Sequence, residues 1–434
     1  MLNKNCCFKK NPFLISIISA VFFLLAVAPA FADINSTQTQ QIQSILNHWR
    51  ERLRIPAVAL SISLPDDDEP ITFVSGTTAL GGLHKITSGT LFQAGSISKS
   101  FTSMIILQLI AQGKIHLDDY ITQYLPQYSQ WGNVTIRELL NHTSGIFDYT
   151  KTAKFQRIRK DNPKAGMTPA EIVSMARAYP PYFPPGKGWK YSNTNYVLVG
   201  MIIEAVTHQS VGNIINYYLR GSQKLHLPNT FYLPGIYSSV GISRMAHGYS
   251  MDGVDVTSNN MAWAYTAGAF VSTTEDLLTW WQSLFQNNIL PNQQLAEMMS
   301  LVCEHTSKNH SCIAGRPAPH LEAWQIDKRY GLGIIQSASG SSEVGTVWWH
   351  NGSTQGYKAI VMWFPKSNIY MSLMIDRDPG YLLIPNLPII RNALHVLLTG
   401  SYTPIVTRHH HSKRRHHNKL QPTNKPIHQI NSIL

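Results

Sequence analysis

Ser96 and Lys99 are the residues whose types and spacing most directly suggest chemistry in this sequence. The apolar residues that follow Ser98 recur with helical periodicity, and Gly113 suits the position just past a helix end. The pattern predicts a buried helix that ends before Gly113 and carries Ser96 in its first turn. Because residues three apart share a helix face, Ser96 and Lys99 are expected to lie side by side.

A serine beside a buried lysine could act as a nucleophile. The hydroxyl of Ser96 is a poor nucleophile at neutral pH unless a neighbouring group takes its proton. The amine of Lys99 can take it if burial lowers the lysine pKa. The helix N-terminus would also stabilise negative charge on a carbonyl oxygen under attack. The alternative is that Ser96 caps the helix and Lys99 is a solvated surface residue.

Two further short motifs place polar side chains at the ends of predicted elements. The sequence Y-S-N at 191–193 precedes a strongly helical segment, and H-N-G at 350–352 ends a predicted strand. Both have an ordinary structural interpretation as well. Ser and Asn favour turns and helix caps, and Asn-Gly is typical of a hairpin turn.

Other hydrolase chemistries find no support in the sequence. No G-x-S-x-G motif occurs, which argues against the usual Ser-His-Asp hydrolases. No H-E-x-x-H zinc motif occurs either, and we expect neither a metal nor any other cofactor. His142, in the segment N-H-T-S-G, is expected to brace a turn.

The elements that must position these motifs are strands at both ends of the chain and helices between them. Strands are predicted at 57–64, 71–80, 330–336 and in three later runs that end near 376; helices are predicted at 38–52, 134–146, 168–179, 194–210, 272–286 and about 385–398. Thr168 and Glu171 form a capping-box pattern. The sequence predicts an α/β (α+β) fold in which both ends of the chain build one antiparallel sheet, flanked by helices.

The predicted organisation has three parts. Residues 1–32 form a signal segment, 33–400 a single hydrolase domain, and 401–434 a basic tail. Within the domain, the sheet part covers about 33–95 and 328–400, and a helical subdomain covers about 100–320. A cleft is expected where the sheet meets the helical subdomain, and all three motifs fall at that boundary.

The basic charge of the chain is concentrated at its ends. The formal net charge is +12, and the last 34 residues contain six Lys or Arg residues and no acid. The body is close to neutral, which argues against a nucleic-acid-binding domain. The tail also holds six of the 18 histidines. We expect a solvated, disordered tail, with contact to an anionic envelope surface as the second interpretation.

The first 32 residues resemble a secretion signal. A basic start is followed by the apolar run 13–28 and by A-F-A, a typical cleavage pattern, before Asp33. The sequence therefore predicts export to the periplasm or the medium, and an uncleaved membrane anchor is the alternative. Cys303 and Cys312 remain in the mature chain, where an oxidising compartment would favour a disulfide between them; two free thiols are the alternative.

Together, the motifs resemble the serine penicillin-recognising enzymes. The order S-x-x-K, then Y-x-N, then a basic residue-x-Gly on a late strand is similar to that of class C β-lactamases, serine DD-carboxypeptidases and the related family VIII esterases. Further blocks agree, among them TIRELLNHTSGI, AGAFVSTTEDL and YGLGI. The resemblance runs from about residue 40 to 375 and implies a β-lactamase/transpeptidase-like fold.

The resemblance implies a role for each matched position. Ser96 would attack a carbonyl and form an acyl-enzyme. Lys99 and Tyr191 would transfer protons, either of them being the acylation base, with Tyr191 held near the phenolate form by Lys99. Asn193 would hydrogen-bond the acylamide of the substrate. The backbone N–H groups of Ser96 and of Ser353, which follows the third motif, would form the oxyanion hole.

The third motif departs from the β-lactamase pattern. His350 stands where β-lactamases of this branch usually have lysine, with Gly352 as the matched glycine. A neutral imidazole is expected at pH 7, hydrogen-bonded to Tyr191. Substitution by lysine is expected to raise activity on substrates that carry a carboxylate. The departure argues against efficient β-lactamase activity.

The sequence thus predicts an exported serine hydrolase. Its substrate would be a D-amino-acid peptide, as for a DD-carboxypeptidase, or a small ester or amide, including peptidoglycan-derived molecules. The alternatives are a protein that binds penicillin or senses cell-wall peptide without turnover, and a weak β-lactamase.

Overall fold

The computed structural model describes residues 34–65, 69–221, 225–286, 288–303, 327–338, 344–378 and 388–400. The predicted signal segment, the basic tail and Cys312 lie outside the described residues. Among the described residues, no single helix is long and apolar enough to cross a membrane. One helix pair, Asn193–Thr207 with Val211–Gly221, passes that test of length and composition together, with a bend of 86°.

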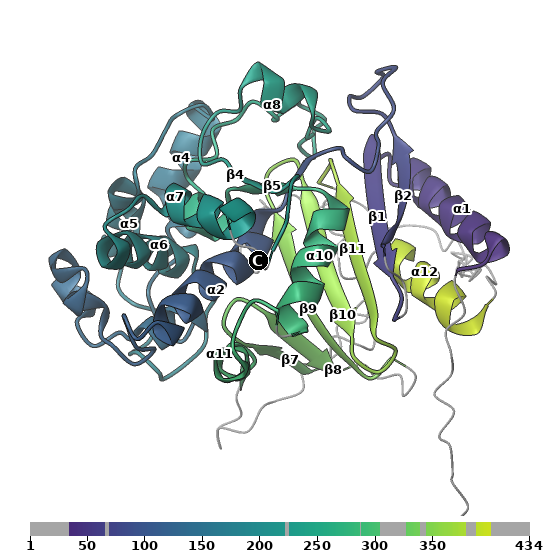
Figure 1. The fold of residues 1–434 in the computed structure, drawn as a ribbon. Helices are drawn as coiled ribbons and strands as arrows, with labels where there is room; N and C mark the ends of the chain where they lie inside the picture. Colours follow the sequence, from purple (N-terminus) through teal and green to yellow (C-terminus); the bar gives the residue numbers. More distant parts are fainter. Residues whose placement is uncertain are drawn as a thin grey trace, which may run out of the picture.

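An eight-stranded antiparallel sheet forms the centre of the molecule, in the order β2-β1-β11-β10-β9-β8-β7-β6 (Figure 1). Its strands are β1 (Ala57–Ser63), β2 (Ile71–Gly76), β6 (Val302–Cys303), β7 (Asp327–Tyr330), β8 (Ile335–Ala338), β9 (Thr346–Ser353), β10 (Lys358–Phe364) and β11 (Ile369–Ile375). β1 pairs with β11, with Val58 opposite Ile375. This pairing joins the two ends of the chain and confirms the predicted sheet.

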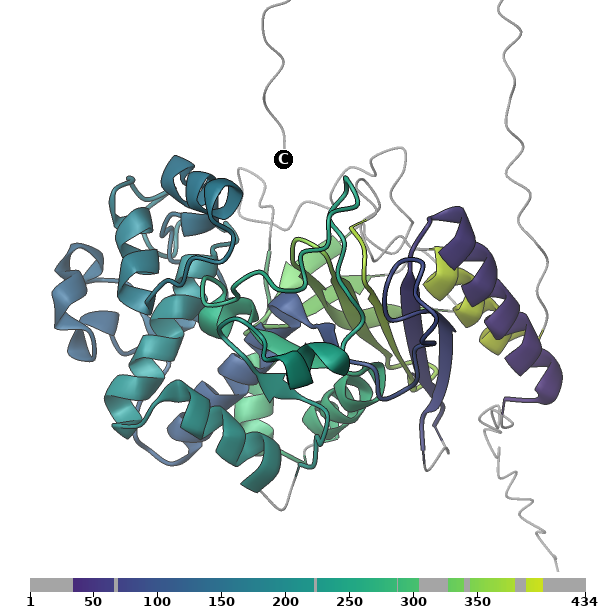
Figure 2. The same cartoon turned by 90° about the horizontal axis from the view of Figure 1, so that it is seen from above.

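Helices cover both faces of the sheet. α1 (Ser36–Arg52) and α12 (Pro388–Thr399) lie on one face, and α10 (Thr274–Phe285) lies on the other, toward α2 (Ser98–Ala111) (Figures 1 and 2). The alternation of side chains along β1 explains the two layers. Val58 and Leu60 belong to the core beneath α1 and α12, whereas Ala57 and Ala59 belong to the core of the opposite face.

The middle of the chain is largely helical and packs against one side of the sheet (Figure 2). Its helices are α3 (Ile136–Leu140), α4 (Ala153–Asp161), α5 (Pro169–Arg177), α6 (Asn193–Thr207), α7 (Val211–Asn216), α8 (Ser239–Ser243), α9 (Tyr265–Gly268) and α11 (Asn292–Met298), with short helical turns η1 (Gly95–Ile97), η2 (Ile121–Gln123), η3 (Pro126–Trp131), η4 (Tyr149–Lys151) and η5 (Tyr217–Gly221). Thr168 and Glu171 form the predicted capping box at the start of α5.

Two predictions about the strands were wrong. Residues 330–336 were predicted as one strand, but β7 ends at Tyr330 and β8 begins at Ile335, and Gly331 N–H donates to the Ile334 carbonyl at 2.8 Å across the turn between them. A single sheet was also predicted, but the structure contains a second one, in the order β3-β5-β4. It is built from β3 (Phe92–Gln93), β4 (Phe231–Tyr232) and β5 (Phe270–Ser272). These strands of two or three residues are too short to show an alternating pattern.

α10 lies in the middle of the sequence but belongs to the layer that covers the large sheet. Thr274 Oγ1 accepts a hydrogen bond from Ser61 Oγ of β1 at 2.7 Å, and Gln282 Nε2 donates to Ser63 Oγ at 2.8 Å. The surface between sheet and helical part therefore includes α10 as well as the chain that follows β3.

Candidate active site

Ser96 lies in a tight helical turn between strand β3 and helix α2. Ala94 N–H donates to the Phe270 carbonyl at 2.9 Å, which continues the pairing of β3 with β5. Gly95 then adopts a left-handed φ of +52°, and η1 runs directly into α2. The hydroxyl of Ser98 donates to the Gly95 carbonyl at 2.6 Å and closes the turn. Ser96 is thereby fixed at the helix start, as predicted.

This turn lies against the end of strand β9. A Cβ atom on Gly95 would come within 2.7 Å of the backbone nitrogen of Ser353, and a Cβ on Gly352 would come within 1.8 Å of the Ala94 carbonyl oxygen. Only glycine permits this approach at both positions. The residue pattern 350–352 is therefore part of a strand, and its interpretation as a hairpin turn is wrong. The approach brings Ser353 beside the turn that carries Ser96.

Lys99 is completely buried and contacts three oxygen atoms. Its Nζ lies 3.0 Å from Ser96 Oγ. It also donates to Asn193 Oδ1 at 2.9 Å and to the Ala267 carbonyl at 2.8 Å. Burial lowers the pKa of Lys99 from 10.5 to about 7, against an opposing effect of the Asp148 carboxylate. The solvated alternative for this lysine is wrong, since its exposed fraction is 0%.

The three contacts of Lys99 match what a neutral amine can offer. A neutral amine has two N–H bonds and one lone pair. The two N–H bonds can remain with Asn193 Oδ1 and the Ala267 carbonyl, which leaves the lone pair directed at the hydroxyl of Ser96. With a pKa of about 7, a large fraction of Lys99 is in this form at neutral pH.

Tyr191 contacts Ser96 from the other side. Its hydroxyl donates to Ser96 Oγ at 2.9 Å, and its ring centre lies 4.8 Å from Lys99 Nζ. Burial raises the pKa of Tyr191 well above its ordinary value, and Tyr196 and Asp148 raise it further, while the hydrogen bond with Ser96 lowers it. Tyr191 is therefore a protonated donor at neutral pH, which differs from the expected near-phenolate.

His142 holds the segment that carries Tyr191. The backbone N–H of Ser192 donates to His142 Nδ1 at 3.3 Å, and that of Lys190 donates to the His142 carbonyl at 3.1 Å. The ring centres of His142 and Tyr191 lie 4.3 Å apart. These bonds on both sides of Tyr191 agree with the expectation that His142 braces a turn.

Asn193 connects Lys99 to a buried acid. Its Oδ1 accepts from Lys99, and its Nδ2 lies 3.2 Å from Asp148 Oδ2. Because the carboxylate accepts and an N–H of Lys99 donates, the two contacts define the orientation of the Asn193 amide. Asp148 is 3% exposed, and burial raises its pKa, while the neighbouring backbone N–H of Thr150 and the charge of Lys99 lower it.

His350 is directed away from the position expected for it. Its Nε2 lies 3.0 Å from the hydroxyl of Tyr330, and its Nδ1 lies 2.7 Å from the carbonyl oxygen of Asn351. The expected hydrogen bond to Tyr191 is replaced by one to Tyr330. His350 is only 1% exposed, so the expectation that it faces a substrate carboxylate is wrong.

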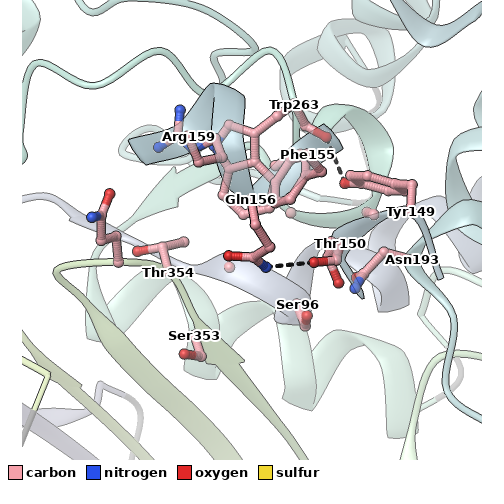
Figure 3. Close-up of a pocket in the computed structure, with 15 residues that line it drawn as sticks. Ser96, Tyr149, Thr150, Phe155, Gln156, Arg159, Asn193, Trp263, Ser353 and Thr354 are labelled. Carbon is pink, nitrogen blue, oxygen red and sulfur yellow. Dashed lines mark hydrogen bonds between the residues drawn. The ribbon is translucent and has the colours of Figure 1, made fainter. Parts of the chain in front are cut away.

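A cavity of about 360 Å³ opens beside Ser96 (Figure 3). Asn193 and Ser353 line it together with Ser96, whereas His350 is not among its lining residues in the described part of the chain. The cavity thus lies between β9 and the helical part, at the boundary where the sequence predicts a cleft.

The wall opposite Ser96 is aromatic. Tyr149, Phe155 and Trp263 line it, and the Tyr149 hydroxyl donates to the Trp263 carbonyl at 2.6 Å (Figure 3). The ring centres of Phe155 and Trp263 lie 5.6 Å apart. An apolar wall that faces a cluster of polar groups is typical of a small-molecule site.

Comparison with known proteins identifies the family. The Beta-lactamase family model matches residues 42–386. The chain belongs to the beta-lactamase family.

This beta-lactamase family member is similar to curated bacterial proteins. It is 28% identical over 339 residues to penicillin-binding protein 4* of Bacillus subtilis (strain 168), a match that covers 73% of this chain and 67% of that protein. It is 25% identical over 360 residues to protein flp of Staphylococcus aureus (strain NCTC 8325 / PS 47), covering 80% and 65%. The chain spans about two thirds of the length of these relatives.

Solved structures share the fold. A D-stereospecific amidohydrolase from Streptomyces sp. is 26% identical with a TM-score of 0.66, over 84% of this chain and 98% of that one. A D-amino acid amidase from Ochrobactrum anthropi SV3 is 24% identical with a TM-score of 0.69, over 83% and 98%. Family and neighbours support the assignment of this beta-lactamase family member as a serine hydrolase.

In this family member the structure shows two contacts of motif residues that the motifs themselves did not indicate. Asp148 contacts Asn193, and Tyr330 contacts His350. Asp148 lies just after the H-T-S-G block, but a single acid in a turn-rich segment carries no spacing signal. Tyr330 begins the strand predicted at 330–336, and that pattern gave it no role beside His350.

Proposed function

We propose that the chain is a serine hydrolase that forms an acyl-enzyme on Ser96. Its substrates would be amides or peptides of D-amino acids, or small esters. The observation that carries the proposal is the double contact of Ser96 Oγ, with Lys99 Nζ at 3.0 Å and the Tyr191 hydroxyl at 2.9 Å. One contact supplies a buried amine of lowered pKa, and the other supplies a proton donor.

The chemistry follows from these protonation states. Neutral Lys99 takes the proton of Ser96 as Oγ bonds to the substrate carbonyl carbon. The backbone N–H groups of Ser96 and Ser353 stabilise the oxyanion. As the bond to the leaving group breaks, Tyr191 donates a proton to it and regains one from Lys99. A water molecule then attacks the ester by the same steps in reverse, which releases the acid and restores Ser96.

The substrate class is supported by the relatives. The neighbour from Streptomyces sp. is a D-stereospecific amidohydrolase. A second candidate function, penicillin binding without turnover, is favoured by the name of the Bacillus subtilis relative. Tyr191 favours turnover, because in deacylation it can take a proton from the attacking water as it passes its own to Lys99.

A chromogenic ester separates the two functions. The protein is incubated with excess p-nitrophenyl acetate, and intact-mass spectrometry follows the acetyl group. An enzyme releases many equivalents of p-nitrophenol, whereas a binder without turnover releases one and stays acylated. Ser96→Ala should abolish both release and labelling by a fluorescent phosphonate or penicillin probe; the matched control, exposed Ser129→Ala, should change neither. Labelling that survives in Ser96→Ala would refute Ser96 as the nucleophile.

The proposal includes export. It is supported by the signal-like pattern of residues 1–32 and by Cys303, which is disulfide-bonded. Fractionation of cells that express the full chain, followed by N-terminal sequencing, would find a mature protein that begins at Asp33. Protein that stays in the cytosol with residues 1–32 attached would refute export.

A further inference from the structure

Arg159 places a guanidinium in the wall of the cavity that contains Ser96. It lies on α4, near the C-terminal end of that helix, and is half-buried. Its side chain lines the cavity together with Phe155 and Trp263. In Figure 3 these three residues lie along one side of the cavity, while Ser96 and Ser353 lie along the other.

Only some of the N–H donors of this guanidinium have acceptors among the described residues. Nη1 donates to the Pro163 carbonyl at 2.9 Å and to the Asn260 carbonyl at 3.1 Å. The guanidinium also lies over the Trp263 ring, 5.3 Å from its centre. These contacts use the two protons of Nη1. The Nε–H and the two protons of Nη2 have no hydrogen-bond partner among the described residues.

Arg159 also lacks a counter-charge in the described part of the chain. Its guanidinium makes no ion pair there, in contrast to Arg137, which pairs with Asp118 at 2.8 Å and Glu297 at 2.6 Å. Burial lowers the pKa of Arg159, and Tyr149 opposes this effect. A partly desolvated charge without a partner carries a free-energy penalty. An anion in the cavity would reduce that penalty.

We infer that Arg159 binds a carboxylate of the substrate through its Nε–H and Nη2–H groups. The inference rests on the proposed function and adds a preference for substrates that carry a carboxylate. The Nε/Nη2 edge presents two parallel N–H bonds, the geometry that pairs with a carboxylate. His350 is closed to this role by its burial and its contact with Tyr330.

The alternative role of Arg159 is to brace α4 against the loop that carries Trp263. The bonds to Pro163 and Asn260 and the contact with Trp263 suffice for such a brace. A brace would support all substrates alike, because it would act through the shape of the cavity. A carboxylate receptor discriminates between a charged substrate and its neutral analogue of the same shape.

The test uses ester pairs that differ only in this charge. On the acyl side, the p-nitrophenyl monoesters of succinic, glutaric and adipic acid are compared with the corresponding esters of their ω-amides. On the alcohol side, the acetate of 3-hydroxybenzoic acid is compared with that of 3-hydroxybenzamide. The measured quantity is the ratio of kcat/KM for each charged substrate to that for its amide, after subtraction of spontaneous hydrolysis.

The wild-type ratio should be at least about 10 in one arm, as expected for charge-assisted hydrogen bonds. The arm that shows it identifies the side of the substrate that carries the carboxylate. Arg159→Gln should bring that ratio close to 1, mainly through a loss on the charged substrate. The matched control is Arg157→Gln, which removes the same charge from an exposed position on the same helix and should keep the ratio.

Several results would overturn the inference. A wild-type ratio near 1 in both arms would do so, as would an equal loss on both members of a pair in Arg159→Gln. If Arg159→Gln does not fold, Arg159→Lys carries the test: it keeps the charge but not the paired N–H bonds, so a ratio equal to that of the wild type would refute the binding mode. Absence of hydrolysis of any ester by the wild type would instead refute the proposed function.

Discussion

The hydroxyl of Tyr330 on β7 lies 3.0 Å from Nε2 of His350 on β9. His350 Nδ1 lies 2.7 Å from the Asn351 carbonyl oxygen, which can only accept, so Nδ1 carries the proton and Nε2 accepts from Tyr330. The Tyr330 ring also contacts the ring of His142, 4.7 Å away, which in turn lies against Tyr191. His350 therefore supports the aromatic surroundings of Tyr191 from inside the protein.

Substitution of His350 by lysine should destabilise the protein. An ammonium at a position that is 1% exposed would be desolvated beside Tyr330, whose hydroxyl cannot neutralise it. We expect a loss of about 3 kcal/mol or more in the free energy of unfolding, measured by urea denaturation. His350→Gln, which is neutral, should lose less. A His350→Lys protein of wild-type stability that gains activity on anionic substrates would restore the role predicted from the sequence.

The activity should rise with pH through the pKa of Lys99. Only the neutral amine can take the proton of Ser96, so kcat/KM should fall at low pH with a midpoint near the Lys99 pKa of about 7. Asp148 raises this pKa by its negative charge. Asp148→Asn should therefore lower the Lys99 pKa and move the acid limb to lower pH.

The control for Asp148 is Asp161→Asn, which removes the same charge from an exposed position and should leave the pH profile in place. The measurement is kcat/KM for a neutral ester between pH 5 and 9 for the three proteins, a range set by about two units on either side of the limb. An acid limb that stays fixed in Asp148→Asn, with activity retained, would show that Asp148 has only a structural role.

Much of the fold was predictable because long elements carry periodic patterns. The helix at 38–52 and the strand at 57–64 correspond to Ser36–Arg52 and Ala57–Ser63. Those elements bury continuous apolar faces, which the sequence displays directly. β5 (Phe270–Ser272), by contrast, has three residues and depends on pairing with distant segments, so its strand state comes from tertiary contacts.

The contact between Ser96 and Lys99 was predictable because it rests on local spacing within one helix start. The contacts of His350 were not predictable, because they depend on the turn at 331–334, after which β8 pairs with β7. The role of Asp148 could not be predicted for a similar reason. Its contact with Asn193 joins segments 45 positions apart, and neither residue type predicts a contact with the other.

Cys303 should contribute to stability through its disulfide. Cys303 is disulfide-bonded in β6, and Cys312 is the partner predicted from the sequence. Closing a loop of roughly ten residues contributes about 2–3 kcal/mol in the chain-entropy model, so Cys303→Ser should lower the free energy of unfolding by a similar amount. Mass spectrometry of protein purified from the envelope, after alkylation without reductant, should find neither cysteine alkylated. Two alkylated cysteines would refute the bridge.

Substitution of Gly352 by alanine should impair catalysis by moving β9 away from Ser96. A Cβ atom there would lie 1.8 Å from the Ala94 carbonyl oxygen, a contact that only backbone movement can relieve. That movement displaces the N–H of Ser353 from the oxyanion position, and loss of one such donor costs about 10²–10³ in kcat. The matched control is Gly235→Ala, whose Cβ would meet no atom within 4 Å; it should keep full activity. We expect Gly352→Ala to retain covalent labelling of Ser96 at a much reduced rate, measured with a phosphonate probe. Unchanged kcat and unchanged labelling rate would show that Ser353 N–H takes no part in the reaction.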